Sequence, residues 1–287
     1  MLVPAPRRPV VVYHDGPTCF TGWAPRDPVS RCVDLIWLTR GPCSTRSEKV
    51  LPNGVIELIV NLGAPHRVID PGDPTRHTRY HASWIAGMQR SFLVIAGEQD
   101  TDLVGIRFRP GGAHALLRRP LCEFTDLVVE LAQVDPGLAL ELHERLLAAP
   151  WGLARVEAVE ALLLRRLDLA GRDPRIEAWA LRLAAAPGDV SVAGFARGLG
   201  VSQKHLIHLC KQQVGLAPKL LSRVLRFHGV IQALQRARAP RWADLAHDFG
   251  YSDQAHLIAE FHAFAGDTPS GYWRARSPDP NHLFVSG

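Results

Sequence analysis

The chain has 287 residues, of which 47% are hydrophobic and 21% charged, with a formal net charge of +5. This composition is typical of a globular protein long enough for two domains. No stretch approaches the roughly 18 continuous apolar residues of a membrane span, and the N-terminal MLVPAPRRPVVVYHDG lacks the apolar region of a secretory signal. We therefore expect a cytoplasmic protein with no membrane partner.

Cysteine and histidine spacing gives no sign of a metal or disulfide framework. The five cysteines are odd in number and lack a CxxC pair, so we expect reduced thiols, with a redox-sensing thiol as the open alternative. His66, His77 and His81 lack HxH spacing and a neighbouring ligand carboxylate. The sequence predicts no metal and no cofactor.

The first 110 residues have the pattern of short strands with no helix between them. The strands are expected at 33–38, 55–61, 91–96 and 103–108. In VIELIVN, Ile56, Leu58 and Val60 share the face expected to pack inward, while Glu57, Ile59 and Asn61 share the other. This pattern favours an antiparallel sandwich or barrel.

After Pro110 the pattern changes to apolar residues three and four apart. It predicts helices at 113–117, 126–132, 137–147 and 151–167. The last of these has an apolar stripe from Leu153 to Leu163, and four charged residues are available to face water: Arg155, Glu157, Arg165 and Arg166. A breaker cluster at 170–174 marks a domain boundary.

From residue 175 onward the pattern is wholly helical. Helices are expected at 175–185, 192–198, 202–214, 217–237, 242–248 and 252–265, with a last turn near 271–273. Ser191, Ser202 and Ser252 occupy the positions of helix N-caps. The part from 171 to 287 has 14 Arg or Lys against 9 Asp or Glu, whereas the first 170 residues have 19 of each. All of the net charge lies in this part, as expected if it meets a polyanion.

One short phrase occurs twice in this part, as FARGLGVS at 195–202 and LAHDFGYS at 245–252. After each phrase come an apolar pair four residues apart, then a Gly, then a Pro. Matching positions of the two units are 50 residues apart up to the Ser and 51 residues apart after it. Each unit predicts a short helix, a tight Gly turn and a longer helix, which is the helix-turn-helix plan. The alternative is a plain helical bundle in which Ala, Gly and Ser serve packing alone.

Two such units joined by the helix at 217–237 can enter successive major grooves about 34 Å apart on one face of a DNA duplex. Residues 175–276, including GYSDQAHLIAEFHAFAGDTPSGYW at 250–273, resemble the DNA-binding domain of AraC/XylS-type transcriptional regulators. The first 160 residues, with VLPNGVIELIVNLG, GMQRS and VGIRFRPGGAHALL, are similar to an uncharacterised N-terminal domain common in such regulators. That resemblance implies a cupin-like β sensor followed by helices.

The predicted fold class is therefore α+β. We expect a sensor or dimerisation domain at 1–170, β-rich to about 110 and helical over 113–168. A DNA-binding domain is expected at 174–276, with helix-turn-helix units at 192–214 and 242–265, followed by a C-terminal tail at 277–287.

On the first reading helix, Leu206 and Cys210 are expected to point inward. The outer face then presents Gln203, Lys204, Ile207, His208 and Lys211. Lys204 and His208 suit base edges, Ile207 suits a thymine methyl group, and Lys211 suits a phosphate.

On the second reading helix the outer face presents Gln254, Ala255, Ile258, Ala259 and His262. The resemblance implies an Arg where Ala259 stands and a basic residue near His262, so this chain departs from the family pattern. Gln254 can still read adenine. Arg223 and Arg226, on the connecting helix, are candidate phosphate contacts.

The first half is neutral and rich in apolar strands, which suits a pocket. Its candidate ligand-binding residues are Glu57, Asn61, His81, Trp84 and Arg107. We expect a sequence-specific transcriptional regulator with double-stranded DNA, RNA polymerase, a small-molecule effector and a second copy as partners. No GxSxG, GxGxxG, P-loop or HExxH motif occurs, so no catalytic residue is predicted. The alternatives are a first half that only dimerises, or one with an unrecognised enzymatic activity.

The first unit is expected to supply most base discrimination and the second chiefly to position the protein. Replacing Lys204 with Ala should therefore reduce the preference for operator over random DNA by about 1–3 kcal/mol, the range for one base-edge contact. Gln254→Ala should weaken binding to both with little change of preference. Binding titrations against the two duplexes measure this. The roles of the two units would be reversed if Lys204→Ala weakened binding to operator and random DNA equally while Gln254→Ala abolished the preference for operator.

Overall fold

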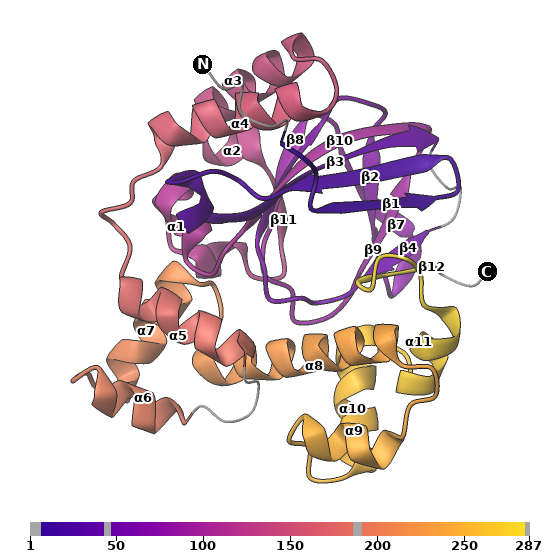
Figure 1. Cartoon of the computed structure of the whole chain (residues 1–287), viewed down its shortest axis with the longest axis vertical. Coiled ribbons are helices and arrows are strands. Elements are labelled where there is room, and N and C mark those ends of the chain that lie inside the picture. The colour runs from indigo at the N-terminus through magenta and orange to yellow at the C-terminus, as the bar shows by residue number, and fades with distance from the viewer. Residues whose placement is uncertain (1–6, 43–46, 186–190, 285–287) are drawn as a thin grey trace.

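The computed structural model describes residues 7–42, 47–185 and 191–284. Strands dominate the first part of the chain and helices the second, as Figure 1 shows, so the α+β class is confirmed. The strands form two antiparallel sheets that face each other. The helices of the second part lie along one side of these sheets, with the long helix α8 (Pro218–Arg236) running beneath them in the view of Figure 1.

The larger sheet has seven antiparallel strands. In sheet order they are β1 (Val11–Asp15), β2 (Thr18–Trp23), β3 (Val33–Pro42), β10 (Asp100–Phe108), β5 (Glu57–Asn61), β8 (Ser83–Ala86) and β11 (Val128–Glu130). The predicted alternation along β5 is confirmed, because Leu58 and Val60 are buried in the main hydrophobic core while Glu57 and Ile59 face the space between the sheets. Both faces of this sheet are therefore covered.

The smaller sheet has five strands. In sheet order they are β12 (His282–Phe284), β4 (Glu48–Val50), β9 (Leu93–Gly97), β6 (His66–Asp70) and β7 (Asp73–Tyr80). The first of these comes from the far end of the chain and pairs antiparallel with β4, and Leu283 is buried. We expected only a tail at 277–287, and its described part instead completes a sheet. Residues 285–287 lie outside the described part.

Four helices follow the strands: α1 (Gly112–Leu117), α2 (Leu131–Val134), α3 (Pro136–Ala148) and α4 (Leu153–Arg166). The helix expected at 126–132 is wrong in its first half, where β11 pairs with β8 before α2 begins. Apolar spacing over so few residues does not distinguish a strand from a helix, and here the hydrogen bonds of the sheet edge decide. Two short 3-10 helices, η1 (Val29–Arg31) and η2 (Leu121–Phe124), complete this half.

The second part consists of helices up to residue 275. They are α5 (Pro174–Ala185), α6 (Val192–Gly198), α7 (Gln203–Gln213), α8, α9 (Trp242–Asp248), α10 (Gln254–Ala265) and α11 (Pro269–Ala275). The 19 residues of α8 give a helix about 28 Å long at 1.5 Å per residue. None of the helices within the described ranges is long and apolar enough to cross a membrane.

The two parts share one hydrophobic core. A single cluster of buried side chains runs from the large sheet through η2 into α8, and it includes Ile56, Leu121, Leu216 and Val224. Polar contacts join the parts as well: the Thr125 hydroxyl donates to the Gly215 carbonyl at 2.9 Å. Because apolar surface is buried across this boundary, separating the parts would expose it to water.

Arg155 was expected to face water and is instead buried, with its side chain 6% exposed. Its guanidinium pairs with Asp102 of β10 at 2.5 Å, which fixes α4 against the large sheet. Helical periodicity places Arg155 beside the apolar stripe of α4 but does not show whether it is buried. Its burial depends on the ion pair with Asp102, which lies on a distant strand.

Replacing Arg155 with Leu should lower the free energy of unfolding by about 3 kcal/mol, because Asp102 would keep only its more exposed partner Arg40. Arg165→Leu, at a half-exposed ion pair on the same helix, should cost less than about 1 kcal/mol. Urea unfolding of both variants measures the difference. Equal stabilities would contradict the role given to the buried pair.

Candidate nucleic-acid interface and pocket

The first helix-turn-helix unit consists of α6 and α7. The turn between them contains Gly200 at φ +67°, a left-handed conformation that glycine adopts without strain. The next amide, of Val201, donates to the Ala196 carbonyl at 3.0 Å, and the Ser202 hydroxyl caps α7 by accepting from the His205 amide at 3.2 Å. Ser202 is therefore confirmed as the N-cap.

The second unit, α9 and α10, repeats this geometry. Gly250 has φ +69°, and the Tyr251 amide donates to the Ala246 carbonyl at 2.9 Å. The expected N-cap Ser252 is wrong: Asp253 caps α10, with its carboxylate accepting from the His256 amide at 2.8 Å. The extra residue of the second unit thus lies in the turn, which explains why the repeat offset changes from 50 to 51 after the Ser.

Both longer helices bury the expected apolar pair and expose the opposite face. Leu206 and Cys210 on α7, and Leu257 and Phe261 on α10, are at most 1% exposed. All ten predicted reading residues are exposed: Gln203, Lys204, Ile207, His208, Lys211, Gln254, Ala255, Ile258, Ala259 and His262. Ile207 and Ile258 occupy equivalent places 51 residues apart and are 36% and 38% exposed, which is unusual for isoleucine. His205, which the sequence pattern did not single out, is exposed on α7 as well.

The two arginines expected to meet phosphate also hold α8 to the second unit. Arg223 forms a bidentate pair with Glu260 of α10, with its shortest contact at 2.6 Å. Arg226 donates to the turn carbonyl of Gly250 at 2.8 Å, and its guanidinium lies 4.9 Å from the Tyr251 ring centre. Their contact with DNA stays a prediction, and these bonds give them a positioning role.

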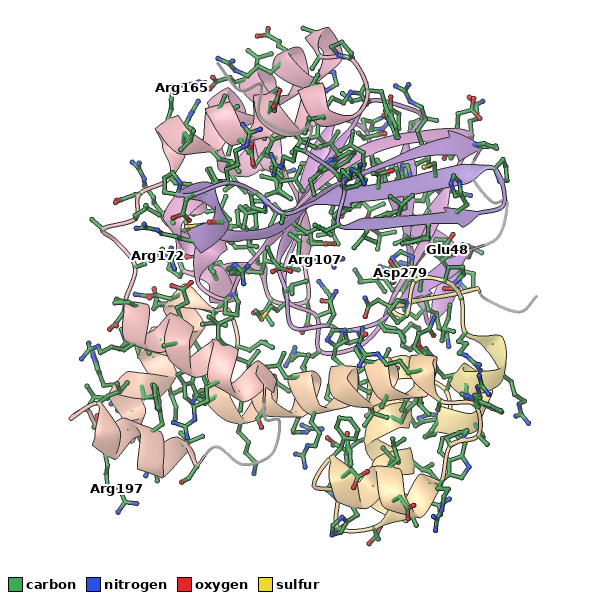
Figure 2. The ribbon with its side chains drawn as sticks, viewed as in Figure 1. Glu48, Arg107, Arg165, Arg172, Arg197 and Asp279 are labelled. Carbon is green, nitrogen blue, oxygen red and sulfur yellow. The ribbon has the colours of Figure 1, made fainter. Side chains whose placement is uncertain are left out.

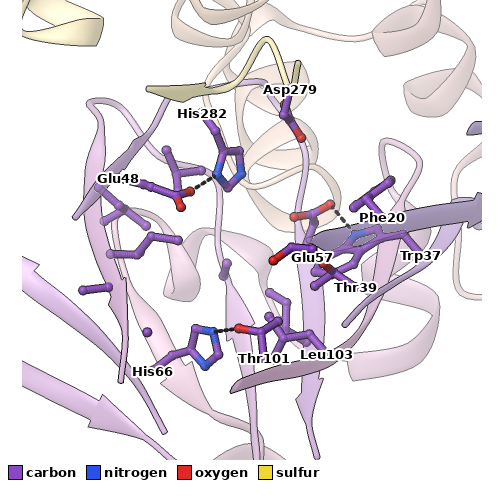
Figure 3. Close-up of a pocket in the computed structure, with 18 of the residues that line it drawn as sticks. Phe20, Trp37, Thr39, Glu48, Glu57, His66, Thr101, Leu103, Asp279 and His282 are labelled. Carbon is purple, nitrogen blue, oxygen red and sulfur yellow. Dashed lines mark hydrogen bonds and ion pairs between the residues drawn. The ribbon is translucent and has the colours of Figure 1, made fainter. Parts of the chain in front are cut away.

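A cavity of about 660 Å³ lies between the two sheets. Three of the five candidate ligand-binding residues, Glu57, Trp84 and Arg107, line it. The Glu57 carboxylate accepts from Arg107 Nε at 2.8 Å and from the indole of Trp37 at 3.1 Å, the latter drawn in Figure 3. Figure 2 shows Arg107 on the side of the sheets that faces α8.

The other two candidates, Asn61 and His81, do not line this cavity. Asn61 is 1% exposed, and its amide donates to the carbonyls of Ala64 and His81 at 2.8 and 3.0 Å. It shares a strand face with Glu57, but it stands at the end of β5, where its side chain holds a turn together. The His81 side chain is exposed at that same turn.

The C-terminal segment 277–283 supplies a wall of the cavity that the sequence did not predict. Asp279 accepts from the Tyr13 hydroxyl at 2.9 Å, and His282 Nδ1 lies 2.9 Å from a Glu48 oxygen, as Figure 3 shows for the second pair. These partners are 266 and 234 residues apart in sequence. No local pattern signals such pairs.

The charges in this wall shift one another's proton affinities. Burial alone would lower the pKa of His282, but the carboxylates of Asp279 and Glu48 outweigh it and raise this pKa to about 9. Burial would raise the pKa of Asp279, but His282, the Asn281 amide and the Tyr13 hydroxyl outweigh it and lower this pKa. His282 is therefore cationic and Asp279 anionic at neutral pH.

The second reading helix touches the same part of the small sheet. Lys49 of β4 donates from Nζ to the carbonyls of Ala265 and Gly266, at 3.2 and 3.3 Å, where α10 ends. A cation at a helix C-terminus is stabilised by the helix dipole. In addition, the Phe92 amide donates to the Phe264 carbonyl at 3.0 Å. Strand β4 is thus bonded to both β12 and the end of α10.

The described cysteines, Cys19, Cys32, Cys122 and Cys210, form no disulfide among themselves, and Cys43 lies outside the described residues. Burial raises the pKa of the Cys210 thiol to about 12. Within the described ranges no group of His, Cys, Asp and Glu side chains is arranged to hold a metal ion.

The duplicated unit with its two exposed reading faces defines a double helix-turn-helix domain. A family model described as a helix-turn-helix domain matches residues 195–275, and one described as a domain of unknown function, DUF6597, matches residues 22–130. The first match places a helix-turn-helix domain in the C-terminal part of this chain. No curated protein matches the chain significantly.

Several solved structures are similar. ToxT from Vibrio cholerae O395 is 10% identical over 83% of this chain and 97% of its own, with a TM-score of 0.46. The C-terminal domain of AraT, a response regulator from Geobacillus stearothermophilus, is 22% identical over 37% of this chain and 91% of its own, with a TM-score of 0.34. A Chromobacterium violaceum regulator with an AraC-type DNA-binding domain is 25% identical over 38% of this chain and 98% of its own, also with a TM-score of 0.34.

The stability of the protein should depend on His282 above neutral pH. Because its pKa in the folded protein, about 9, exceeds its ordinary value of 6.5, its stabilisation is complete below about pH 6.5 and is lost as the pH rises through 9. The melting temperature of the wild type should fall more between pH 6.5 and 9.5 than that of His282→Gln. His247→Gln, at an exposed histidine of α9, should follow the wild type. Parallel curves for wild type and His282→Gln would refute the assignment.

Proposed function

We propose that this protein is a sequence-specific transcriptional regulator whose DNA binding is controlled by a small molecule in the cavity between the sheets. The observation that carries the proposal is the geometrically matched pair of helix-turn-helix units. Each turn has the same left-handed glycine, and each second helix buries one apolar pair and exposes the face that a major groove would meet. A plain bundle has no need for two equivalent exposed faces.

Two further features support DNA binding: the positive charge of the second part and the length of the connecting helix α8. The part from residue 171 onward has the whole net charge of +5, and Lys204 and Lys211 lie on the exposed face of α7. The length of α8, about 28 Å, is close to the pitch of about 34 Å between successive major grooves. We also propose that the protein contacts RNA polymerase and a second copy of its own chain.

The shared cavity wall supports control by an effector. Asp279 and His282 line the cavity and follow α11, the last helix after the second reading unit, by only a few residues. A ligand in the cavity would contact this segment and the sheets at once. The ligand would therefore bind with one affinity when the segment is docked on the sheets and with another when the segment is displaced. Such a difference in affinity between two states is what coupling between two sites requires.

Selection of bound duplexes from a random pool by the full-length protein, at a fixed salt concentration, tests the reader. We expect a consensus of two short blocks about one helical turn apart. A variant with both Lys204→Ala and Gln254→Ala should lose the consensus, and Arg165→Ala, on the far side of the first part, should keep it. If the folded wild-type protein enriches no sequence, or if the double variant keeps the consensus, the sequence-specific reader is refuted.

A further inference from the structure

The charges that line the cavity are paired, with one exception. Glu57 pairs with Arg107 at 2.8 Å, Glu48 with His282 at 2.9 Å, and Arg67 with Glu98 at 3.5 Å. Asp279 accepts hydrogen bonds from the Tyr13 hydroxyl and the Asn281 amide, at 2.9 and 2.8 Å. Among the described residues, no Lys, Arg or His nitrogen lies within ion-pair distance of it. The lining has three negative charges and three positive ones, and Asp279 is the one charge among them without a direct ion-pair partner.

Aromatic side chains line the cavity, and one of them, Tyr13, bonds the Asp279 carboxylate. Tyr13 stacks on Phe20 with 4.6 Å between ring centres, and Phe20 stacks on Trp37 at 5.5 Å. Farther along the larger sheet Trp84 of β8 contacts Tyr80, with ring centres 5.6 Å apart, and both line the cavity. The faces of aromatic rings attract cations and accept flat apolar groups, so this lining suits a molecule that combines the two.

We propose that the cavity binds an organic cation, an aromatic or apolar molecule with a protonated amine, and that Asp279 is its counterion. This inference rests on the proposed function, because it identifies the chemical class of the effector. The aromatic walls would hold the body of the ligand, and its ammonium group would bond the Asp279 carboxylate.

An anionic ligand fits the same lining less well. Of the two arginines that line the described part of the cavity, Arg107 is paired with Glu57 and Arg67 with Glu98. A ligand carboxylate there would also face the carboxylates of Glu48 and Asp279. Burying a charge without a counterion is costly, whereas an ammonium group would give Asp279 the direct ion-pair partner that it lacks.

The position of Asp279 gives the cation a route to the reader. Asp279 lies between α11, which ends at Ala275, and β12, which begins at His282. The end of α8 is bonded to the same segment, because the side-chain amide of Gln235 donates to the Ser277 carbonyl at 2.7 Å. An amine on Asp279 would alter the bond to Tyr13 and with it the seating of the C-terminal segment.

Isothermal titration of the full-length protein with three matched probes tests the proposal. Tryptamine, tryptophol and indole-3-propionate share an indole and a two-carbon chain, and they differ only in a cationic, neutral or anionic end. We expect tryptamine to bind at least tenfold more tightly than tryptophol, and indole-3-propionate to bind most weakly. Asp279→Asn should reduce the affinity for tryptamine at least tenfold and that for tryptophol less than threefold. Asp279→Glu, which keeps the charge, should retain most of the preference.

Asp248→Asn, the same substitution at an exposed position of α9, should leave all three affinities unchanged. If tryptamine binds no better than tryptophol or indole-3-propionate, or none of the three binds, the cation site is refuted, even where Asp279→Asn fails to fold. Since the titration contains no DNA, a failure of the cation site and a failure of the DNA selection are independent results.

Discussion

The pairing of β12 with β4 is the constraint on which the arrangement of the two halves depends. It attaches the end of the chain, just after the second reading unit, to the sheet that borders the cavity. The Leu51 amide donates to the Asn281 carbonyl at 2.8 Å and extends this attachment, while Lys49 of the same strand bonds the end of α10. One three-residue strand thus contacts the C-terminal segment, the second reading helix and, through Glu48, the cavity.

The two reading units are attached to the first half in different ways. The first is held near the C-terminal end of α7, where Val214 and Leu216 enter the shared core and Gly215 accepts from Thr125. The second is held by polar bonds to β4, by the Phe92 ring that packs against Gly266, and by the C-terminal segment. Polar bonds at a partly exposed boundary exchange readily with water, whereas a buried apolar contact does not. Because β12 and β4 join the second unit to the cavity wall, its position is the one that a ligand would change most directly under the proposed regulation.

Much of the DNA-binding part could be predicted from sequence because its signals are local. A turn glycine, an apolar pair four residues apart and a capping residue lie within one short window, and all of them recur in the second unit. The N-cap of α10 was predicted as Ser252 and is Asp253, an error of one residue between two side chains that both favour the N-cap position. The strand β7 (DPTRHTRY) was missed because most of it is exposed and polar, without the alternation of a half-buried strand.

The cavity was harder to predict, because its composition depends on contacts between distant residues. Glu57, Trp84 and Arg107 were recognised as polar or aromatic groups on apolar strands. The strand pattern placed Asn61 on the same face as Glu57, so it was as good a candidate as Glu57. Its side chain is kept out of the cavity by the turn at the end of β5. Tyr13, Asp279 and His282 have no periodicity to mark them, and they meet only because β12 returns to β4.

Hydrogen–deuterium exchange on the full-length protein tests the central claim, that the C-terminal segment links the cavity to the second reading unit. Leu283→Asp places a charge where a buried leucine now anchors β12. The account predicts faster exchange in β4, α11 and α10, with α7 unchanged, because the first unit is held by the shared core. Unchanged exchange in α10 and α11, or an equal increase in α7, would contradict it.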